Sequence, residues 1–247
     1  MTTNRSKFSL LPLSKSIIGL AIRKRSTAGS LNDRTNAVPR TKMDYLDVGL
    51  FFFYVSMLAL AFRTAGHFGM MARRAVETPP LGLQVAVSVC LLGLLGLTIK
   101  IRHGYGAWEA LGWTMPDRPH LLTALAGGVL LGIGVDVLAH TTRGGAHIIR
   151  ARDLFVLGVS LGPILEESYF RGCLLPVLSR TTGPLAGLLV SAVIFATMHP
   201  VTSVVQWCCF IVSGVAYGWI RLKSGSTAAS ALMHAIYNLT LFFCQFT

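Results

Sequence analysis

Charged residues are scarce in this chain, and acidic residues are the scarcest. Of 247 residues, 13% are charged and only 10 are Asp or Glu, whereas 53% are hydrophobic. A soluble globular domain carries about 25% charged residues, so this composition excludes a water-soluble domain. Segments of alternating polar and apolar residues, which are typical of membrane barrels, are missing as well. The composition therefore predicts an all-α, polytopic transmembrane helical bundle.

Motifs for metal and redox chemistry are also missing. The five cysteines lie in apolar segments without C-x-x-C spacing, so we interpret them as small core residues. The chain contains no H-E-x-x-H motif, which would place two zinc ligands on one helix. It lacks the internal repeat that many secondary transporters have. A transporter with a proton-coupled glutamate is therefore the least favoured function.

The basic residues account for the net charge of +12 without a nucleic-acid partner. Nine of the 22 Lys and Arg lie in residues 1–42, and nearly all of the others flank apolar segments. Positive charge in such places faces anionic lipid, so we expect membrane lipid as a partner and no nucleic acid. Residues 1–45 are predicted to form a disordered, basic N-terminal arm. An organellar transit peptide, which is also rich in Arg and Ser, is the alternative.

Seven apolar segments follow the arm and define residues 46–247 as a transmembrane domain. Each is close to the roughly 17–25 residues that a spanning helix needs. They cover residues 46–62, 81–101, 121–140, 154–178, 184–199, 204–221 and 227–246. With a cytoplasmic N-terminus the inner connections hold 15 Lys and Arg and the outer ones six, as the positive-inside rule requires. We expect about seven spans in a bacterial plasma membrane, with an active-site cavity inside the bundle.

The fourth segment contains an unusual stretch, Glu166–Arg171. An ionisable side chain at bilayer depth costs on the order of 2.5–3.5 kcal/mol, so such residues indicate a function. Glu167 and Arg171 are four residues apart and share one helix face, where they can form an ion pair. Glu166 points about 100° away from that face and has no such partner on its own helix. Glu166 is therefore the carboxylate available for chemistry.

Two later segments carry polar side chains that could meet Glu166. The fifth segment ends in Phe195-x-x-x-His199, and the seventh contains His234 and Asn238, four residues apart on one face. A Glu and a His can hold and deprotonate a water molecule, and a second His with an Asn amide can stabilise an oxyanion. The alternative is a zinc site of Glu166, His199 and His234 with an open water position. We favour a site without metal or other cofactor.

Three motifs, in this order and in separate spans, resemble those of the CPBP family. These are the membrane-embedded CAAX prenyl endopeptidase-like and bacteriocin-processing proteins, also called the Abi family. The motifs are Glu-Glu-x-x-x-Arg at 166–171, Phe-x-x-x-His at 195–199 and His-x-x-x-Asn at 234–238. The resemblance covers residues 121–246, and it implies hydrolysis of peptide bonds within or at the membrane.

The resemblance also implies a role for each matching residue. The implied catalytic residues are Glu166, His199, His234 and Asn238. The first two would activate water, and the other two would line the oxyanion pocket. The implied supporting residues are Glu167, Arg171 and Phe195. The ion pair would hold its helix in place, and the phenyl ring would orient the helix that carries the first histidine.

We therefore expect an intramembrane endopeptidase that cleaves membrane-associated peptides, including prenylated CAAX-type peptides, with a water activated by Glu and His. Its partners would be membrane lipid and a peptide or lipidated-protein substrate. The alternative is a membrane immunity or scaffold protein that binds a peptide or protein partner through the same cavity without cleaving it. Substitution of Glu166 would abolish the first function and could spare the second.

Overall fold

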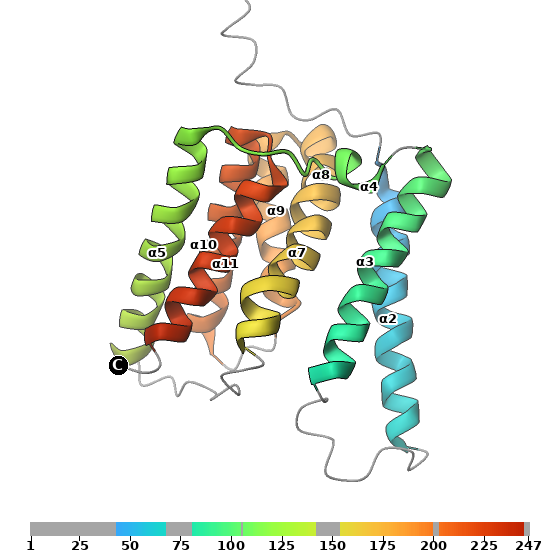
Figure 1. Ribbon diagram of the computed structural model, residues 1–247, viewed down its shortest axis with the longest axis horizontal. Helices are drawn as coiled ribbons and strands as arrows, with labels where there is room; N and C mark the ends of the chain where they lie inside the picture. Colours follow the sequence, from blue (N-terminus) through green and yellow to red (C-terminus); the bar gives the residue numbers. More distant parts are fainter. Residues whose placement is uncertain (1–42, 68–80, 105, 142–153, 200–202, 245–247) are drawn as a thin grey trace, which may run out of the picture. The chain divides into compact units, whose positions relative to one another are not determined.

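Helices make up every regular element that the structure describes. The computed structural model describes residues 43–67, 81–104, 106–141, 154–199 and 203–244, and Figure 1 shows their helices coloured along the chain. The predicted all-α fold class is thus confirmed for this part of the chain. The predicted basic arm, residues 1–45, lies almost entirely outside the described ranges.

Each of the seven predicted apolar segments corresponds to a helical segment. In chain order the elements are α2 (Tyr45–His67), α3 (Leu81–His103), α4 (Ala107–Ala110), α5 (Arg118–Thr141), η1 (Leu154–Leu161), α7 (Gly162–Glu167), η2 (Ser168–Leu174), α8 (Leu175–Thr182), α9 (Pro184–Thr197), α10 (Val204–Ser224) and α11 (Thr227–Cys244), where η denotes a π-helix. The elements from η1 to α8 follow one another without a break. The predicted fourth segment is therefore one helical rod whose hydrogen-bond pattern changes along its length.

Several helices have the length and composition of membrane spans. Among the described residues, those long and apolar enough to cross a membrane are Leu81–His103, Arg118–Leu138, Val204–Ser224 and Thr227–Cys244. The apolar helices Tyr45–Ala61 and Pro184–Thr197 are shorter, so the count of seven spans stays a prediction. Leu130 of α5 is 70% exposed and Leu97 of α3 is 55% exposed, as expected for surfaces that face lipid. Together these features support an integral membrane protein.

Helices α5 and α11 pack closely because α5 has glycines where the two helices meet. A Cβ added to Gly128 would lie 2.6 Å from the carbonyl oxygen of Met233, and one added to Gly132 would lie 2.6 Å from Cβ of Thr240. Small residues permit this kind of close helix contact in membranes. The contact holds α11, which carries His234, against a long apolar neighbour.

The connection between α3 and α5 is tied to the turn between α10 and α11. Thr227 donates its hydroxyl to the carbonyl of Leu111 at 2.6 Å, and its N–H to the carbonyl of Gly112 at 2.8 Å. The indole N–H of Trp113 donates to Ser168 Oγ at 3.0 Å. The connection is therefore fastened both to the start of α11 and to the rod that carries the two glutamates.

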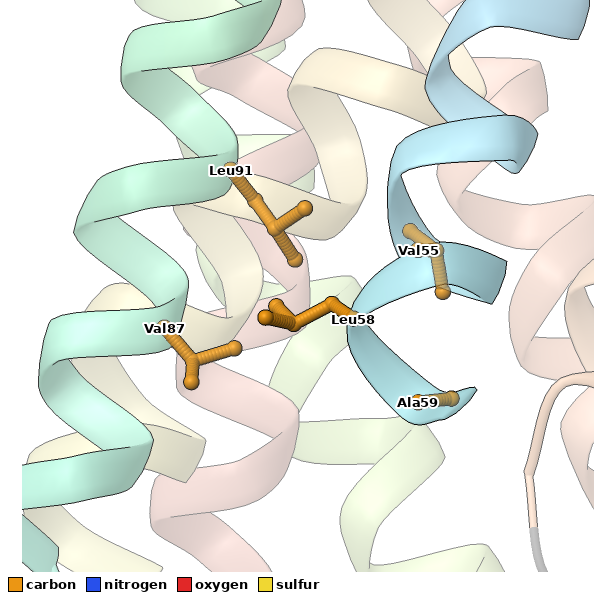
Figure 2. A pocket seen from close by; sticks show the side chains of 5 residues that line it. All are labelled: Val55, Leu58, Ala59, Val87 and Leu91. Carbon is orange, nitrogen blue, oxygen red and sulfur yellow. The ribbon is translucent and has the colours of Figure 1, made fainter. Parts of the chain in front are cut away.

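An apolar cavity of about 230 Å³ lies between α2 and α3. Figure 2 shows its lining side chains, Val55, Leu58, Ala59, Val87 and Leu91. None of the predicted site residues is among them, so this cavity is not the predicted active-site cavity. An ion-pair network ties the same two helices together, because Asp47 of α2 accepts from Arg102 Nε at 2.6 Å and contacts His103 Nε2 at 2.9 Å.

Candidate active site

Glu166 and Glu167 lie at the end of a short α-helical turn between two π-helical stretches, η1 and η2. In a π-helix the hydrogen bonds join residues five apart, and such turns are frequent at functional sites. A Cβ on Gly162, at the change from η1 to α7, would lie 2.5 Å from the carbonyl oxygen of Leu157. A side chain does not fit there. The glycine thus permits the change of helix type that precedes the two carboxylates.

Glu167 is fully buried, and both of its oxygens have hydrogen-bond partners. Its Oε1 accepts from Arg171 Nη1 at 2.9 Å and lies 3.0 Å from His234 Nδ1. Its Oε2 accepts from the Ser230 hydroxyl at 2.7 Å. The ion pair that the i,i+4 spacing predicts is therefore present. It also extends across to α11 through two partners that lie more than 60 residues away in the sequence.

Arg171 holds the rod against α9 and α10. Its second terminal nitrogen, Nη2, donates to the carbonyl of Gly214 at 2.9 Å. The guanidinium carbon lies 4.6 Å from the ring centroid of Phe195 and 5.3 Å from that of Tyr217, within the range of cation–π attraction. The cation thus contacts a carboxylate, a carbonyl and aromatic faces, which is how a charge can persist in an apolar bundle, whereas its buried Nε has no hydrogen-bond partner among the described residues.

Glu166 faces both predicted histidines. Its Oε2 lies 3.7 Å from His199 Nε2 and 4.0 Å from His234 Nε2. These separations are longer than a hydrogen bond. The Glu166 side chain is 32% exposed, yet its Oε2 is buried and has no hydrogen-bond partner among the described residues. A buried carboxylate oxygen of this kind is suited to accept a proton or to bind a small polar molecule.

The hydrogen bonds of the two imidazoles set which ring nitrogen faces Glu166. His199 Nδ1 lies 2.8 Å from the carbonyl oxygen of Phe195, and because a carbonyl only accepts, Nδ1 carries the hydrogen. His234 Nδ1 lies against the Glu167 carboxylate in the same way. In the neutral rings both Nε2 atoms therefore present lone pairs towards Glu166. Three acceptor atoms, Glu166 Oε2 and the two Nε2 atoms, therefore face one another, and a water molecule between them can donate to two of the three.

Phe195 supports both histidines from α9. Its ring centroid lies 4.6 Å from that of His199 and 6.0 Å from that of His234. The predicted helix over residues 184–199 is shorter in the structure, because α9 ends at Thr197 and His199 lies in the turn that follows. The reason is Pro200, since a residue that precedes proline is disfavoured in the helical conformation.

Asn238 follows His234 on one face of α11, as predicted, but it contacts the backbone of the rod. Its Nδ2 donates to the carbonyl of Gly158 at 2.5 Å. One amide hydrogen is therefore engaged away from Glu166, and the expected oxyanion role would use the other. The structure thus brings Glu166, His199 and His234 together, with Asn238 one turn further along α11.

Three residues that the sequence reasoning missed also belong to this region. They are Ser230, Tyr217 and Arg221. Ser230 lies four residues before His234, so helical spacing could have identified it. The Tyr217 ring stacks on His234 with centroids 4.6 Å apart, and Arg221 Nε donates to the carbonyl of Arg171 at 3.2 Å. Both lie on α10, where no motif points to them.

A zinc ion would have to bind Glu166 Oε2 and the Nε2 atoms of His199 and His234. The donor types suit zinc, and both Nδ1 atoms have the acceptors that support such ligands. The spacing fits less well, because ligands about 2.05 Å from a tetrahedral ion lie roughly 3.3 Å apart, against the observed 3.7 and 4.0 Å. Among the described residues, no group of three His, Cys, Asp or Glu side chains has the geometry of a metal site. The described site is thus wider than a tetrahedral zinc site, and the choice between a metal-free and a zinc-dependent site stays a prediction.

A comparison with family models agrees with the three motifs. Residues 152–240 match the family model described as "Type II CAAX prenyl endopeptidase Rce1-like". The match contains all three motifs and confirms the predicted family for this part of the chain, although it is shorter than the predicted core over residues 121–246. This is a family of proteases, so a peptidase is the class of enzyme that the match supports. Comparisons with curated proteins and with solved structures give no match.

Proposed function

We propose that this protein is an intramembrane endopeptidase that hydrolyses peptide bonds of membrane-associated peptides, including prenylated CAAX-type peptides. One observation carries the proposal. The Oε2 of Glu166 is buried, has no hydrogen-bond partner within the described part of the chain, and faces the Nε2 atoms of His199 and His234 at 3.7 and 4.0 Å. A general base must lie within reach of the water that it deprotonates, and a contact longer than 3.5 Å between polar groups is the distance that a water can bridge.

Glu166 would act as general base and then as general acid. A water molecule held between Glu166 Oε2 and His199 Nε2 attacks the carbonyl carbon of the scissile peptide, and its proton passes to Glu166. The C–O bond forms as the carbonyl π electrons move to oxygen. When the tetrahedral intermediate collapses, the C–N bond breaks and Glu166 returns the proton to the leaving amine.

His234 is the group best placed to stabilise the oxyanion. A proton taken up from solvent at His234 Nε2 would give that nitrogen a hydrogen on the side of Glu166, while the Nδ1 hydrogen stays on Glu167, 3.0 Å away. Donors fixed in advance at a developing negative charge lower the barrier because they need no reorganisation during the reaction. Glu167 and Arg171 would hold His234 in this orientation.

We propose no catalytic metal or other cofactor. The separations around Glu166 Oε2 are longer than those of a zinc site, and the proposed steps need only the side chains already in place. The partners would be membrane lipid and a peptide or lipidated-protein substrate, with the N-terminus on the cytoplasmic side of a bacterial plasma membrane. The charge distribution of the connections supports that orientation.

The test is peptide cleavage by the purified protein in lipid vesicles, with prenylated and unprenylated peptides as substrates. Glu166→Gln and His199→Ala are expected to lower kcat by about 10²–10⁴-fold, the usual contribution of general acid–base catalysis. Glu109→Gln and His120→Ala are matched controls, because both residues lie outside the site and the Glu109 side chain is exposed. Cleavage that survives Glu166→Gln would refute the mechanism. Binding of peptide without cleavage by the wild-type protein would favour the immunity or scaffold function instead.

A further inference from the structure

Pro163 interrupts the backbone hydrogen bonding of the rod one turn before Glu166. In η1 each N–H bonds to the carbonyl five residues earlier, so in a continued pattern the N–H of residue 163 would bond to the carbonyl of residue 158. Proline has no N–H. A carbonyl with too few donors in an apolar environment carries a free-energy cost, so a side-chain donor from elsewhere in the bundle would take the place of the missing N–H.

Asn238 supplies a donor to that carbonyl. Its Nδ2 lies 2.5 Å from the Gly158 oxygen, although the two residues are 80 positions apart in the sequence. A carbonyl oxygen only accepts, so the amide nitrogen donates. Asn238 lies four residues after His234 on the same face of α11. One helix therefore carries both the histidine that faces Glu166 and the amide that holds the backbone behind it.

The backbone winds tightly at the junction between η1 and α7. A Cβ on Gly162 would lie 2.5 Å from the carbonyl oxygen of Leu157 and 3.8 Å from Glu166 Oε1. A rotation or slip of α7 relative to η1 would move Glu166 with it. The separation between Glu166 Oε2 and His234 Nε2, 4.0 Å, therefore depends on how this junction is held. A misplacement of about 1 Å can cost an enzyme roughly a hundredfold in rate.

We infer that Asn238 is a positioning residue whose amide replaces the N–H that Pro163 lacks, and that it thereby holds Glu166 at its working distance from His234. The inference rests on the proposed function and deepens it. It places the contribution of Asn238 behind the general base, whereas an oxyanion role for its second amide hydrogen is the alternative that the test distinguishes.

A double-mutant cycle tests this role, with the wild-type protein, Asn238→Ala, Pro163→Ala and the double variant. In the wild-type background Asn238→Ala is expected to lower kcat by about 10–100-fold and to change KM by less than about threefold. In the Pro163→Ala background, where a backbone N–H can reach Gly158, the same substitution is expected to cost less than about threefold in kcat. An oxyanion donor would instead cost about 10²–10³-fold in both backgrounds, and that result would overturn the inference.

A second readout needs no substrate. Backbone hydrogen exchange of peptides that cover residues 162–167 is expected to accelerate in Asn238→Ala, and to accelerate much less when Pro163→Ala is also present. Equal acceleration in both backgrounds would overturn the inference. If the wild-type protein cleaves no peptide, the proposed function fails, whereas the exchange cycle still decides whether Asn238 holds this junction.

Thr240→Val is the matched control. It removes a hydroxyl that donates to the carbonyl of Ile236 on the same helix and leaves the Gly158 bond in place. It is expected to change neither kcat nor exchange at residues 162–167. An effect as large as that of Asn238→Ala would show that any lost hydrogen bond on α11 has the same consequence, and would overturn the specific role of Asn238.

Discussion

Replacing Arg171 with methionine would leave the Glu167 carboxylate buried without its cation. The two side chains are 1% and 0% exposed, and Nη1 lies 2.9 Å from Oε1. At that separation and an effective dielectric constant near 20, their attraction is about 6 kcal/mol, and the cost of dehydrating both groups offsets much of it. Removal of one partner of such a pair typically costs about 3–5 kcal/mol, because the other charge stays buried. We expect Arg171→Met to lower the free energy of unfolding by this amount.

A second substitution separates charge from packing. Arg171 also donates to the carbonyl of Gly214 and lies against aromatic rings, and the methionine loses these contacts in either background. Glu167→Gln removes the negative charge and keeps a side chain that can still bond Ser230 and His234. The double variant should therefore be more stable than Arg171→Met alone, by a few kcal/mol.

The assay is denaturant unfolding of the four proteins in detergent micelles, followed by tryptophan fluorescence. A loss of less than about 1 kcal/mol in Arg171→Met, the value typical of an exposed ion pair, would refute the reasoning. So would a double variant that is no more stable than Arg171→Met, because the stranded carboxylate would then not be the cause of the loss.

Three further outcomes are expected. Arg221→Met should leave the unfolding midpoint unchanged or raise it, because the buried Nη1 and Nη2 of Arg221 have no hydrogen-bond partner among the described residues. A loss of stability as large as that of Arg171→Met would contradict this. Gly128→Leu should lower the free energy of unfolding by about 1–3 kcal/mol, and with it the thermal midpoint, because its Cβ would lie 2.6 Å from the Met233 carbonyl oxygen. An unchanged midpoint would show that α5 does not pack as described. Peptide cleavage should persist in the presence of a strong chelator. If the chelator abolishes cleavage and added zinc restores it, a metal site at Glu166 would be established instead.

Much of the site follows from spacing along single helices. Residues four apart share a face of a helix, so the Glu167–Arg171 ion pair and the common face of His234 and Asn238 can be predicted without any knowledge of helix packing. The same arithmetic leaves Glu166 without a partner on its own helix. The π-helical stretches on either side of α7 could not be predicted, because the amino-acid pattern of an apolar segment does not show whether its backbone hydrogen bonds join residues four or five apart.

The partners across helices depend on packing. Ser230 donates to Glu167 although the two are 63 positions apart in the sequence. Tyr217 stacks on His234 from another helix, and Asn238 donates to the carbonyl of Gly158. The sequence by itself determined the helical bundle, the buried charges and the motifs, since these depend on composition and on the helical period. Only the tertiary structure decided which carboxylate oxygen faces the two histidines and which amide holds the backbone behind it. Those contacts depend on the rotation and separation of neighbouring helices, which periodicity within a single helix does not specify.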